Sequence, residues 1–203
     1  MKRNALFYGD NLEVLRGRDA DGRPLIRDES VDLIYLDPPF NSASNYNVLF
    51  KAPDGKASDS QIEAFEDTWH WTDAAVRCFQ DVVTGHHQRA GTLLKAMRDA
   101  LGENDMMAYL AMMAARLVEL HRVLKPTGSL YLHCDPTASH FLKLLLDGIF
   151  GPENFRNEIV WKRGHAHNSA KRYGLTCSPE MAPFIGRVCS NEGRTNEAQQ
   201  VQR

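Results

Sequence analysis

Apolar residues near the start of the chain fall into short runs that end in turn residues. The run ALFYGD, residues 5–10, predicts a strand that stops at a Gly-Asp turn. It is followed by NLEVLRG, where Leu12 and Leu15 lie one helical turn apart, which predicts a short helix. The run VDLIYL, residues 31–36, predicts a second strand, and its continuous apolar character is typical of a central parallel strand covered on both faces.

The middle of the chain has the periodicity of helices. It predicts amphipathic helices over 72–83 and 92–101, and a longer, heavily buried helix over 104–124. Several methionines lie at helical spacing in this third helix. Such a stripe can form an adaptable binding face, but beside leucines at this spacing we expect it to pack in the core.

A third and a fourth strand follow. KPTG, residues 125–128, is expected to break the long helix, and SLYLHCD, residues 129–135, predicts a strand. A helix over 136–150 starts with a proline, and NFRNEIVWKR, residues 154–163, predicts another strand. Strands that alternate with helices indicate an α/β fold, with a mostly parallel sheet and flanking helices.

This organisation fades toward the end of the sequence. Residues 175–203 show no sustained period and become almost wholly polar, so we expect no folded element there. The sequence therefore predicts one partial domain over 1–174 and a divergent, disordered or poorly packed tail over 175–203.

Composition narrows the class of protein only a little. With 203 residues, 43% hydrophobic and 25% charged, the chain fits one globular domain or a large piece of one. The formal net charge of −2 means that contact with nucleic acid must come from a local basic patch. Neither a signal-peptide pattern nor a membrane-spanning stretch is visible, so a cytoplasmic location without a membrane partner is the expectation.

Cysteines and histidines do not form a metal-ligand pattern. The four cysteines are far apart and include no CxxC pair. The histidine pairs His86-His87 and His165, His167 are expected to be solvated side chains rather than ligands. We therefore expect no bound metal.

Acidic residues follow three of the predicted strands, namely Asp10, Asp37 and Asp135. Ligands of open parallel sheets collect at the carboxyl ends of strands, so these carboxylates could share one cleft. For Asp135 a role as a helix cap is favoured, because Pro136 begins the next helix. Asp37 has no such simple explanation, because two prolines follow it.

The segment Asp37-Pro38-Pro39-Phe40 combines acceptors with an aromatic ring. The prolines remove two backbone donors and hold the chain extended, so the carboxylate and the following carbonyl oxygens can face one way. This suits a flat heterocycle whose exocyclic amino group donates to Asp37 and the Pro38 carbonyl while Phe40 stacks on its ring. An aryl amine is a poor nucleophile, and two acceptors would hold its nitrogen toward an electrophile.

These residues resemble the catalytic D-P-P-[YF] motif of amino-group DNA methyltransferases, which use S-adenosylmethionine to methylate adenine N6 or cytosine N4. Five segments carry the resemblance further: FYGDNLEVL, VDLIYLDPPFNSASNYNVLF, AFEDTWHW, LKPTGSLYLHCDPTASHFLKLLLDGIFG and NFRNEIVWKR. Together they are similar to the N-terminal half of β-class enzymes such as the modification subunits of type III restriction-modification systems. The resemblance covers residues 4–174 and implies an S-adenosylmethionine-dependent methyltransferase (Rossmann-like) fold.

The resemblance also implies roles for single residues. Asp37 and Pro38, with Pro39, would bind the target amino group, and Phe40 would stack on a base flipped out of the duplex. Asp10 and Asp37 would lie beside the cofactor. An Asp at the first motif position favours adenine N6 as the target, with cytosine N4 as the alternative.

Contacts with double-stranded DNA are implied for the segment after the fourth strand. The matching residues would frame the base pocket or bind phosphates, although a solvated basic loop is the alternative reading. They are Trp161, Lys162, Arg163, Asn168, Lys171 and Arg172. A restriction subunit or a second copy of the chain is the further partner that the resemblance implies.

The Gly-rich cofactor turn of this family, F-x-G-x-G-like, does not occur in the sequence. In the β class it lies toward the C-terminus, so we expect this chain to be a truncated N-terminal half with impaired S-adenosylmethionine binding. Three hypotheses follow: a DNA methyltransferase that needs a second chain for its cofactor half, a module that only binds DNA, and an inactive remnant.

Overall fold

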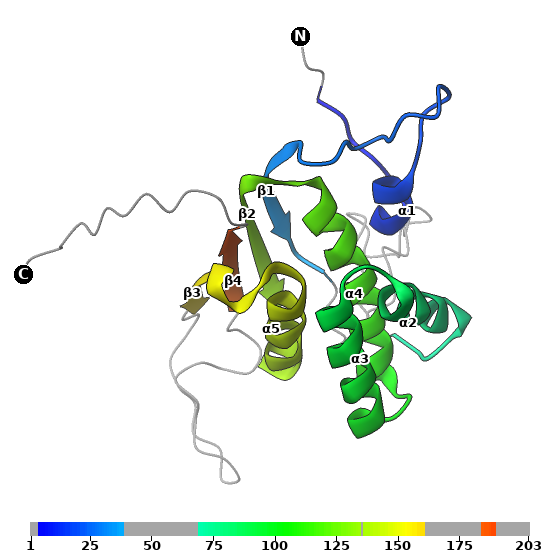
Figure 1. Cartoon of the computed structure of the whole chain (residues 1–203), viewed down its shortest axis with the longest axis vertical. Helices are drawn as coiled ribbons and strands as arrows, with labels where there is room; N and C mark the ends of the chain where they lie inside the picture. Colours follow the sequence, from blue (N-terminus) through cyan, green and yellow to red (C-terminus); the bar gives the residue numbers. More distant parts are fainter. Residues whose placement is uncertain (1–3, 39–68, 135, 161–183, 190–203) are drawn as a thin grey trace, which may run out of the picture.

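The structure is a computed structural model that describes residues 4–38, 69–134, 136–160 and 184–189 (Figure 1). The elements in chain order are α1 (Asn11–Arg16), β1 (Val31–Leu36), α2 (Asp73–Thr84), α3 (Gln88–Leu101), α4 (Asp105–Val123), β2 (Leu124–Cys134), α5 (Pro136–Phe150), the short 3-10 helix η1 (Pro152–Asn154), β3 (Phe155–Val160) and β4 (Phe184–Cys189).

The described strands form one sheet in the order β1-β2-β4-β3. β1 pairs in parallel with β2, and β4 runs antiparallel to both β2 and β3. It follows that β1, β2 and β3 point in one direction and that β4 opposes them. Helices α2 to α5 stand together beside this sheet (Figure 1). This arrangement confirms the predicted α/β class with flanking helices.

Helix α4 is the central element of the core. It packs against α1, α2, α3 and α5, and most of its residues are buried. A helix covered on most sides must be apolar nearly all round, which is the pattern that DMMAYLAMMAARLVELHRV shows. Met107 and Met113 are buried in the main hydrophobic cluster, so the prediction that the methionines pack in the core is confirmed for these two.

The ends of α4 connect it to the sheet. The Asn104 side chain caps its first turn by accepting a hydrogen bond from the Met107 backbone N–H at 2.9 Å. At its other end the helix runs directly into β2, because the helix cap Leu124 is also the first residue of the strand. The Ser30 backbone N–H, one residue before β1, donates to the Val123 carbonyl at 2.9 Å. The beginnings of both paired strands are therefore held at the C-terminus of α4.

Alternate residues of β2 face the helices. Leu130, Leu132 and Cys134 are fully buried and belong to the same cluster as Ile34 of β1. The strand is longer than predicted, since it includes KPTG, but the pairing register jumps there: Val31 pairs with Leu124 and Leu33 with Ser129. KPTG was expected to separate the helix from the strand, but it lies within β2 and disturbs the pairing with β1 there.

Two predictions about the first strands are wrong. Residues 4–9, which include most of ALFYGD, form neither strand nor helix, and Leu6 is 98% exposed. β1 is an edge strand of the described sheet, and its Leu33 and Tyr35 side chains are more than half exposed. An apolar run indicates a tendency to be buried. Whether another strand pairs with it, or other elements pack on it, depends on distant parts of the chain.

The backbone of residues 184–189 corrects a third prediction. We expected no folded element after residue 175, yet β4 fills the position between β2 and β3. A six-residue strand carries little signal of its own, because its stability comes from the two neighbouring strands with which it forms hydrogen bonds. The rest of the predicted tail lies outside the described residues, so the division at residue 174 stays a prediction.

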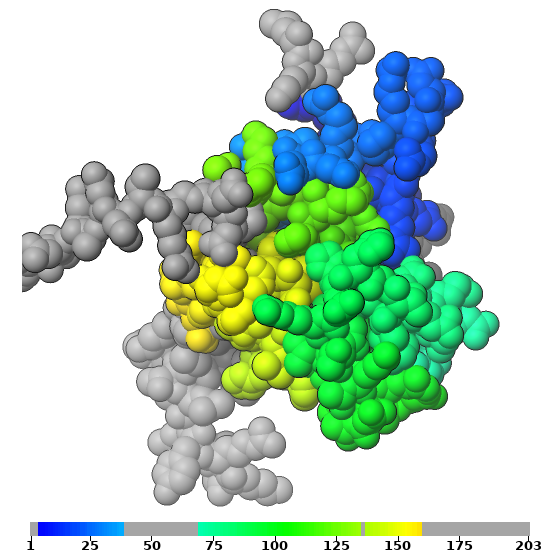
Figure 2. Space-filling model, viewed as in Figure 1, coloured from blue at the N-terminus to red at the C-terminus, as the bar shows by residue number. Residues whose placement is uncertain are grey.

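The loop between α1 and β1 projects from the body of the molecule (Figures 1 and 2). It is closed by an Arg18–Pro24 bridge and by Asp19, whose side chain accepts from the backbone N–H groups of Asp21 and Arg23. In the described part of the chain, no helix is both long and apolar enough to cross a membrane.

Two histidines form an edge-to-face aromatic stack with Phe150, the last residue of α5. The His87 and His121 rings lie edge to face at 5.1 Å, and His121 meets Phe150 in the same way at 5.0 Å. Burial lowers the pKa of both histidines from the ordinary 6.5, and a nearby imidazole lowers it further: that of His86 for His87, and that of His87 for His121. His86 is exposed, as predicted, whereas His87 is only partly exposed.

This stack makes stability depend on pH. Because the folded-state pKa values lie below 6.5, the unfolded chain takes up these protons first as the pH falls. The two histidines should therefore make their full contribution to the free energy of unfolding above pH 6.5. The free energy of unfolding should decrease as the pH falls through their folded-state pKa values. Urea denaturation between pH 7.5 and 5 measures it, and His121→Phe, which keeps a ring but cannot titrate, should show a shallower decrease.

Candidate active site at the carboxyl end of strand β1

Asp37 stands directly after the last residue of β1, and its carboxylate meets His133 of β2. His133 Nδ1 and Asp37 Oδ1 are 2.6 Å apart, and the two side chains are 20% and 61% exposed. The strand register explains the meeting: Tyr35 pairs with Tyr131, so the positions two residues further along each strand lie side by side on the same face. The site therefore begins at the edge where parallel strands present their carboxyl ends.

Pro38 determines how the chain leaves the strand. A residue before proline is disfavoured in the helical region, which favours an extended backbone at Asp37. Pro38 itself is partly buried. Pro39 and Phe40 lie outside the described residues, and their predicted parts in the site stay predictions.

Sequence reasoning missed His133. It lies in the alternating segment SLYLHC, whose buried positions 130, 132 and 134 imply that 129, 131 and 133 face the other way. This alternation was a signal that His133 faces away from the buried side chains of β2. Its position beside Asp37 depends on the pairing of β1 with β2, which the local sequence does not reveal.

Asp10 has a structural environment that was not predicted. It caps α1 by accepting from the Leu12 backbone N–H at 2.8 Å, and Arg116 Nη2 lies 2.7 Å from each of its carboxylate oxygens. Arg116 is 9% exposed, and it also donates to Asn11 Oδ1 and to the Met112 carbonyl. Asp10 thus ties the first turn of α1 to α4.

Two tryptophans each lie beside an arginine of the helical layer. The Arg116 guanidinium lies 5.8 Å from the centre of the Trp69 ring, which packs against Tyr109. Trp71 packs edge to face on Phe79, and Arg98 lies over both rings. The described part of the segment AFEDTWHW therefore anchors the chain to the helical layer just before α2.

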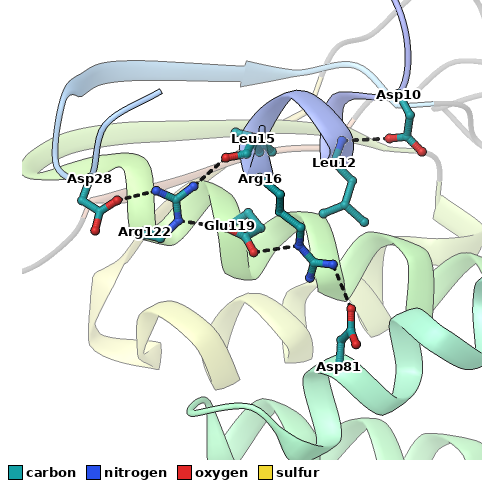
Figure 3. Close-up of polar contacts among 8 residues, drawn as sticks. All are labelled: Asp10, Leu12, Leu15, Arg16, Asp28, Asp81, Glu119 and Arg122. Atoms are coloured by element: carbon teal, nitrogen blue, oxygen red, sulfur yellow. Dashed lines mark hydrogen bonds and ion pairs between the residues drawn. The ribbon is translucent and has the colours of Figure 1, made fainter. Parts of the chain in front are cut away.

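A second group of charges joins α1, α2 and α4 (Figure 3). Glu119 accepts from Arg16 Nε at 2.9 Å and from Arg122 Nε at 2.8 Å. Arg16 also binds Asp81 at 2.8 Å, and Arg122 binds Asp28 and donates to the Leu15 carbonyl at 2.7 Å. These side chains form one series of alternating charge, which we call the Glu119 network: Asp81, Arg16, Glu119, Arg122 and Asp28.

Burial lowers the pKa of Arg16 and of Arg122, but hydrogen bonds to carboxylates outweigh it, so that both pKa values are raised. For Arg16 these acceptors are Asp81 and Glu119, and for Arg122 they are Glu119 and Asp28. Both guanidinium groups therefore remain charged in these contacts.

The predicted DNA-binding residues 161–172 and the third acidic strand end, Asp135, lie outside the described residues. The shared cleft of the three carboxylates therefore stays a prediction. Asp10 does not follow a strand in the structure, because residues 4–9 are not one.

Two cavities lined by described residues lie elsewhere, between α3 and α5. Their volumes are about 610 and 340 Å³, and Gln88, Arg89 and Gly148 line both. Within the described ranges, no group of three or more His, Cys, Asp or Glu side chains is arranged to hold a metal ion.

Comparison with known protein families identifies the family of this chain. The DNA methylase family, the N6/N4 methyltransferases, matches residues 31–185, which is more than half of the sequence and includes Asp37 and His133. The chain therefore belongs to the DNA methylase family. The resemblance drawn from the D-P-P-F segment is confirmed at this level.

Several characterised proteins are similar over most of this chain. The Mod subunit of the type III restriction-modification enzyme StyLTI of Salmonella typhimurium is 29% identical over 160 residues, which cover 79% of this chain and 20% of that subunit. The type II methyltransferase M.KpnI of Klebsiella pneumoniae is 23% identical, with 83% and 29% covered. The EcoP15I Mod subunit of Escherichia coli is 26% identical, with 80% and 21% covered. The chain thus spans between 20% and 29% of the length of these relatives.

Removing the charge of Glu119 tests the network that joins the helices. Glu119→Gln should lower the free energy of unfolding by about 1–2 kcal/mol, because two arginines lose their shared anion while each keeps another acceptor. Chemical denaturation measures this change. The matched control Asp99→Asn, on the exposed side of α3, should change stability by less than about 0.5 kcal/mol. Equal effects of the two substitutions would contradict a structural role for the network.

Substitutions of Asp10 separate its cap from its ion pair. Asp10→Asn keeps an acceptor for the Leu12 N–H and loses only the charge opposite Arg116, so a loss of about 1–2 kcal/mol is expected. Asp10→Ala removes both and leaves the buried guanidinium without its anion, so a loss of about 2–4 kcal/mol is expected. Thermal and urea unfolding measure both, and an Ala variant as stable as the wild type would refute the anchoring role.

Proposed function

We propose that this chain carries the part of a DNA methyltransferase that binds the amino group of a base flipped out of double-stranded DNA. The observation that carries the proposal is the exposed Asp37 carboxylate at the carboxyl end of β1, followed by Pro38, inside the segment that matches the DNA methylase family. The relatives named above are Mod subunits and a type II methyltransferase, which supports the same reaction class.

The geometry supports the chemistry at Asp37. One carboxylate oxygen meets His133, and the side chain is 61% exposed, so the other oxygen is accessible to a donor from outside. An exocyclic amino group has two hydrogens, which Asp37 and the Pro38 carbonyl can accept together. Acceptors placed in the plane of the base would direct the nitrogen lone pair toward the methyl donor.

S-adenosylmethionine would supply the methyl group as an electrophile. Among the described residues predicted to hold it, Asp10 already accepts three hydrogen bonds from the chain. A carboxylate has about four acceptor positions, and the Asp10 side chain is 40% exposed, so one position fits a hydroxyl of the cofactor. We propose that Asp10 orients α1 and contributes at most this one contact.

Adenine N6 is our preferred target, and cytosine N4 is the alternative, since the preference rests on the Asp at the first motif position. Residues 161–172 are proposed to contact the base and the DNA backbone. A restriction subunit or a second copy of the chain is the proposed protein partner, in a cytoplasmic setting.

A second candidate function is DNA binding without catalysis. The sequence has no F-x-G-x-G-like turn, and the chain matches at most 29% of the length of the relatives named above. Under this alternative the chain retains DNA but transfers no methyl group. The two functions differ in whether methyl transfer is detected when DNA is bound.

Asp37→Asn tests the proposed role directly. The amide keeps the size of the side chain but replaces one acceptor with a donor, so methyl transfer should fall by at least about a hundredfold. Retention of DNA in a filter assay should fall by no more than about tenfold, because most of the affinity comes from contacts with the DNA backbone. Methyl transfer is measured by the incorporation of a labelled methyl group from S-adenosylmethionine into DNA. Continued turnover in this variant would refute the role of Asp37.

Asp32→Asn is the matched control for this experiment. Asp32 lies on β1, five positions before Asp37; it pairs with Lys125 at 2.6 Å, and its side chain is 77% exposed. We expect its methyl transfer to stay within about twofold of the wild type, because exposed ion pairs contribute little. DNA retention without transfer in the wild type would favour the binding module.

A further inference from the structure

The contact between His133 and Asp37 joins a fixed side chain to a less constrained one. His133 belongs to β2, which has β1 on one side and β4 on the other, and its own backbone position pairs with Ile185. Asp37 lies one residue beyond the end of β1 and is 61% exposed, against 20% for His133. The histidine is therefore the rigid partner, and the carboxylate takes its orientation from it.

The chemistry of the pair determines the direction of the hydrogen bond. An ionised carboxylate only accepts hydrogen bonds, so a separation of 2.6 Å requires a proton on His133 Nδ1. The bond engages Oδ1 and leaves Oδ2 for a ligand. It also restricts rotation of the carboxylate, whose torsion about the Cβ–Cγ bond is otherwise broad.

We propose that His133 is a positioning residue that holds the Asp37 carboxylate in the plane in which it accepts the amino group of the target base. This inference rests on the proposed function and assigns one further residue to it. Acceptor strength depends on the angle at which the donor approaches, so a carboxylate free to rotate would bind the amino group less well. Small losses of alignment at a reacting centre can cost up to about a hundredfold in rate.

Three substitutions separate a positioning role from simple packing. In His133→Asn the amide nitrogen is attached to Cγ, as Nδ1 is in histidine, so the donor to Asp37 is retained. His133→Gln places its amide nitrogen one bond further out, and His133→Leu keeps apolar volume without any donor. The matched control is His140→Leu, an exposed histidine of α5.

The readout is recognition of the amino group, which requires no methyl transfer. The probes are two DNA duplexes that differ only at one base opposite an abasic position: one carries adenine and the other purine, which lacks the amino group. An unpaired base needs little energy to leave the stack. The ratio of the two dissociation constants, measured by fluorescence anisotropy with the full chain, reports the contact with the amino group.

We expect the wild type and His140→Leu to bind the adenine duplex about tenfold more tightly than the purine duplex, as a hydrogen bond to a charged group implies. His133→Asn should keep this preference within about twofold of the wild type, whereas His133→Leu and His133→Gln should lose most of it. If packing alone mattered, His133→Leu would keep the preference better than His133→Asn. That result would overturn the proposal while leaving the proposed function intact.

Failure of the proposed function looks different. In that case the wild type itself would bind both duplexes equally, and the role of His133 would fall with it. Nitrogen-15 spectra of the imidazole add a readout that is independent of DNA: Nδ1 should carry the proton in the wild type, and its signal should shift in Asp37→Asn. An unchanged Nδ1 signal would show that the two side chains do not interact in solution and would refute the proposal.

Discussion

The register of β1 against β2 is the constraint on which the site depends. With Leu36 opposite Leu132, Ile34 is directed into the core, and the position of Asp37 falls beside His133 on the opposite face. Because side chains alternate along a strand, a slip of one residue would expose Ile34 and move the carboxylate to the other face. The same pairing therefore serves the core and the candidate chemistry.

The helical layer holds this register in place. α4 continues into β2 without a loop, and the backbone before β1 donates to the last residues of α4. The Glu119 network and the Arg116–Asp10 pair then attach α1 to the same helix. Partly buried ion pairs of this kind are directional, so they fix the orientation of elements that apolar packing alone would leave less well defined.

The candidate site divides into a part that the sequence predicts and a part that it does not. Asp37 followed by two prolines is an unusual end for an apolar strand, and that local oddity led to the amino-group hypothesis. His133 and Arg116 carry no comparable local signal. One belongs to an alternating strand and the other to a long helix, and each gains its importance from a partner about a hundred residues away.

By itself, the sequence determined the positions of the helices, the two strands of the parallel pair and the identity of the acceptor segment, because periodicity and turn chemistry are local properties. Tertiary structure decided that 5–10 is not a strand, that β1 lies at an edge of the described sheet, that 184–189 pairs between β2 and β3, and which side chains meet Asp10 and Asp37. These outcomes depend on hydrogen bonds and ion pairs between segments distant in sequence. The local sequence of a short segment does not specify which distant segment it contacts.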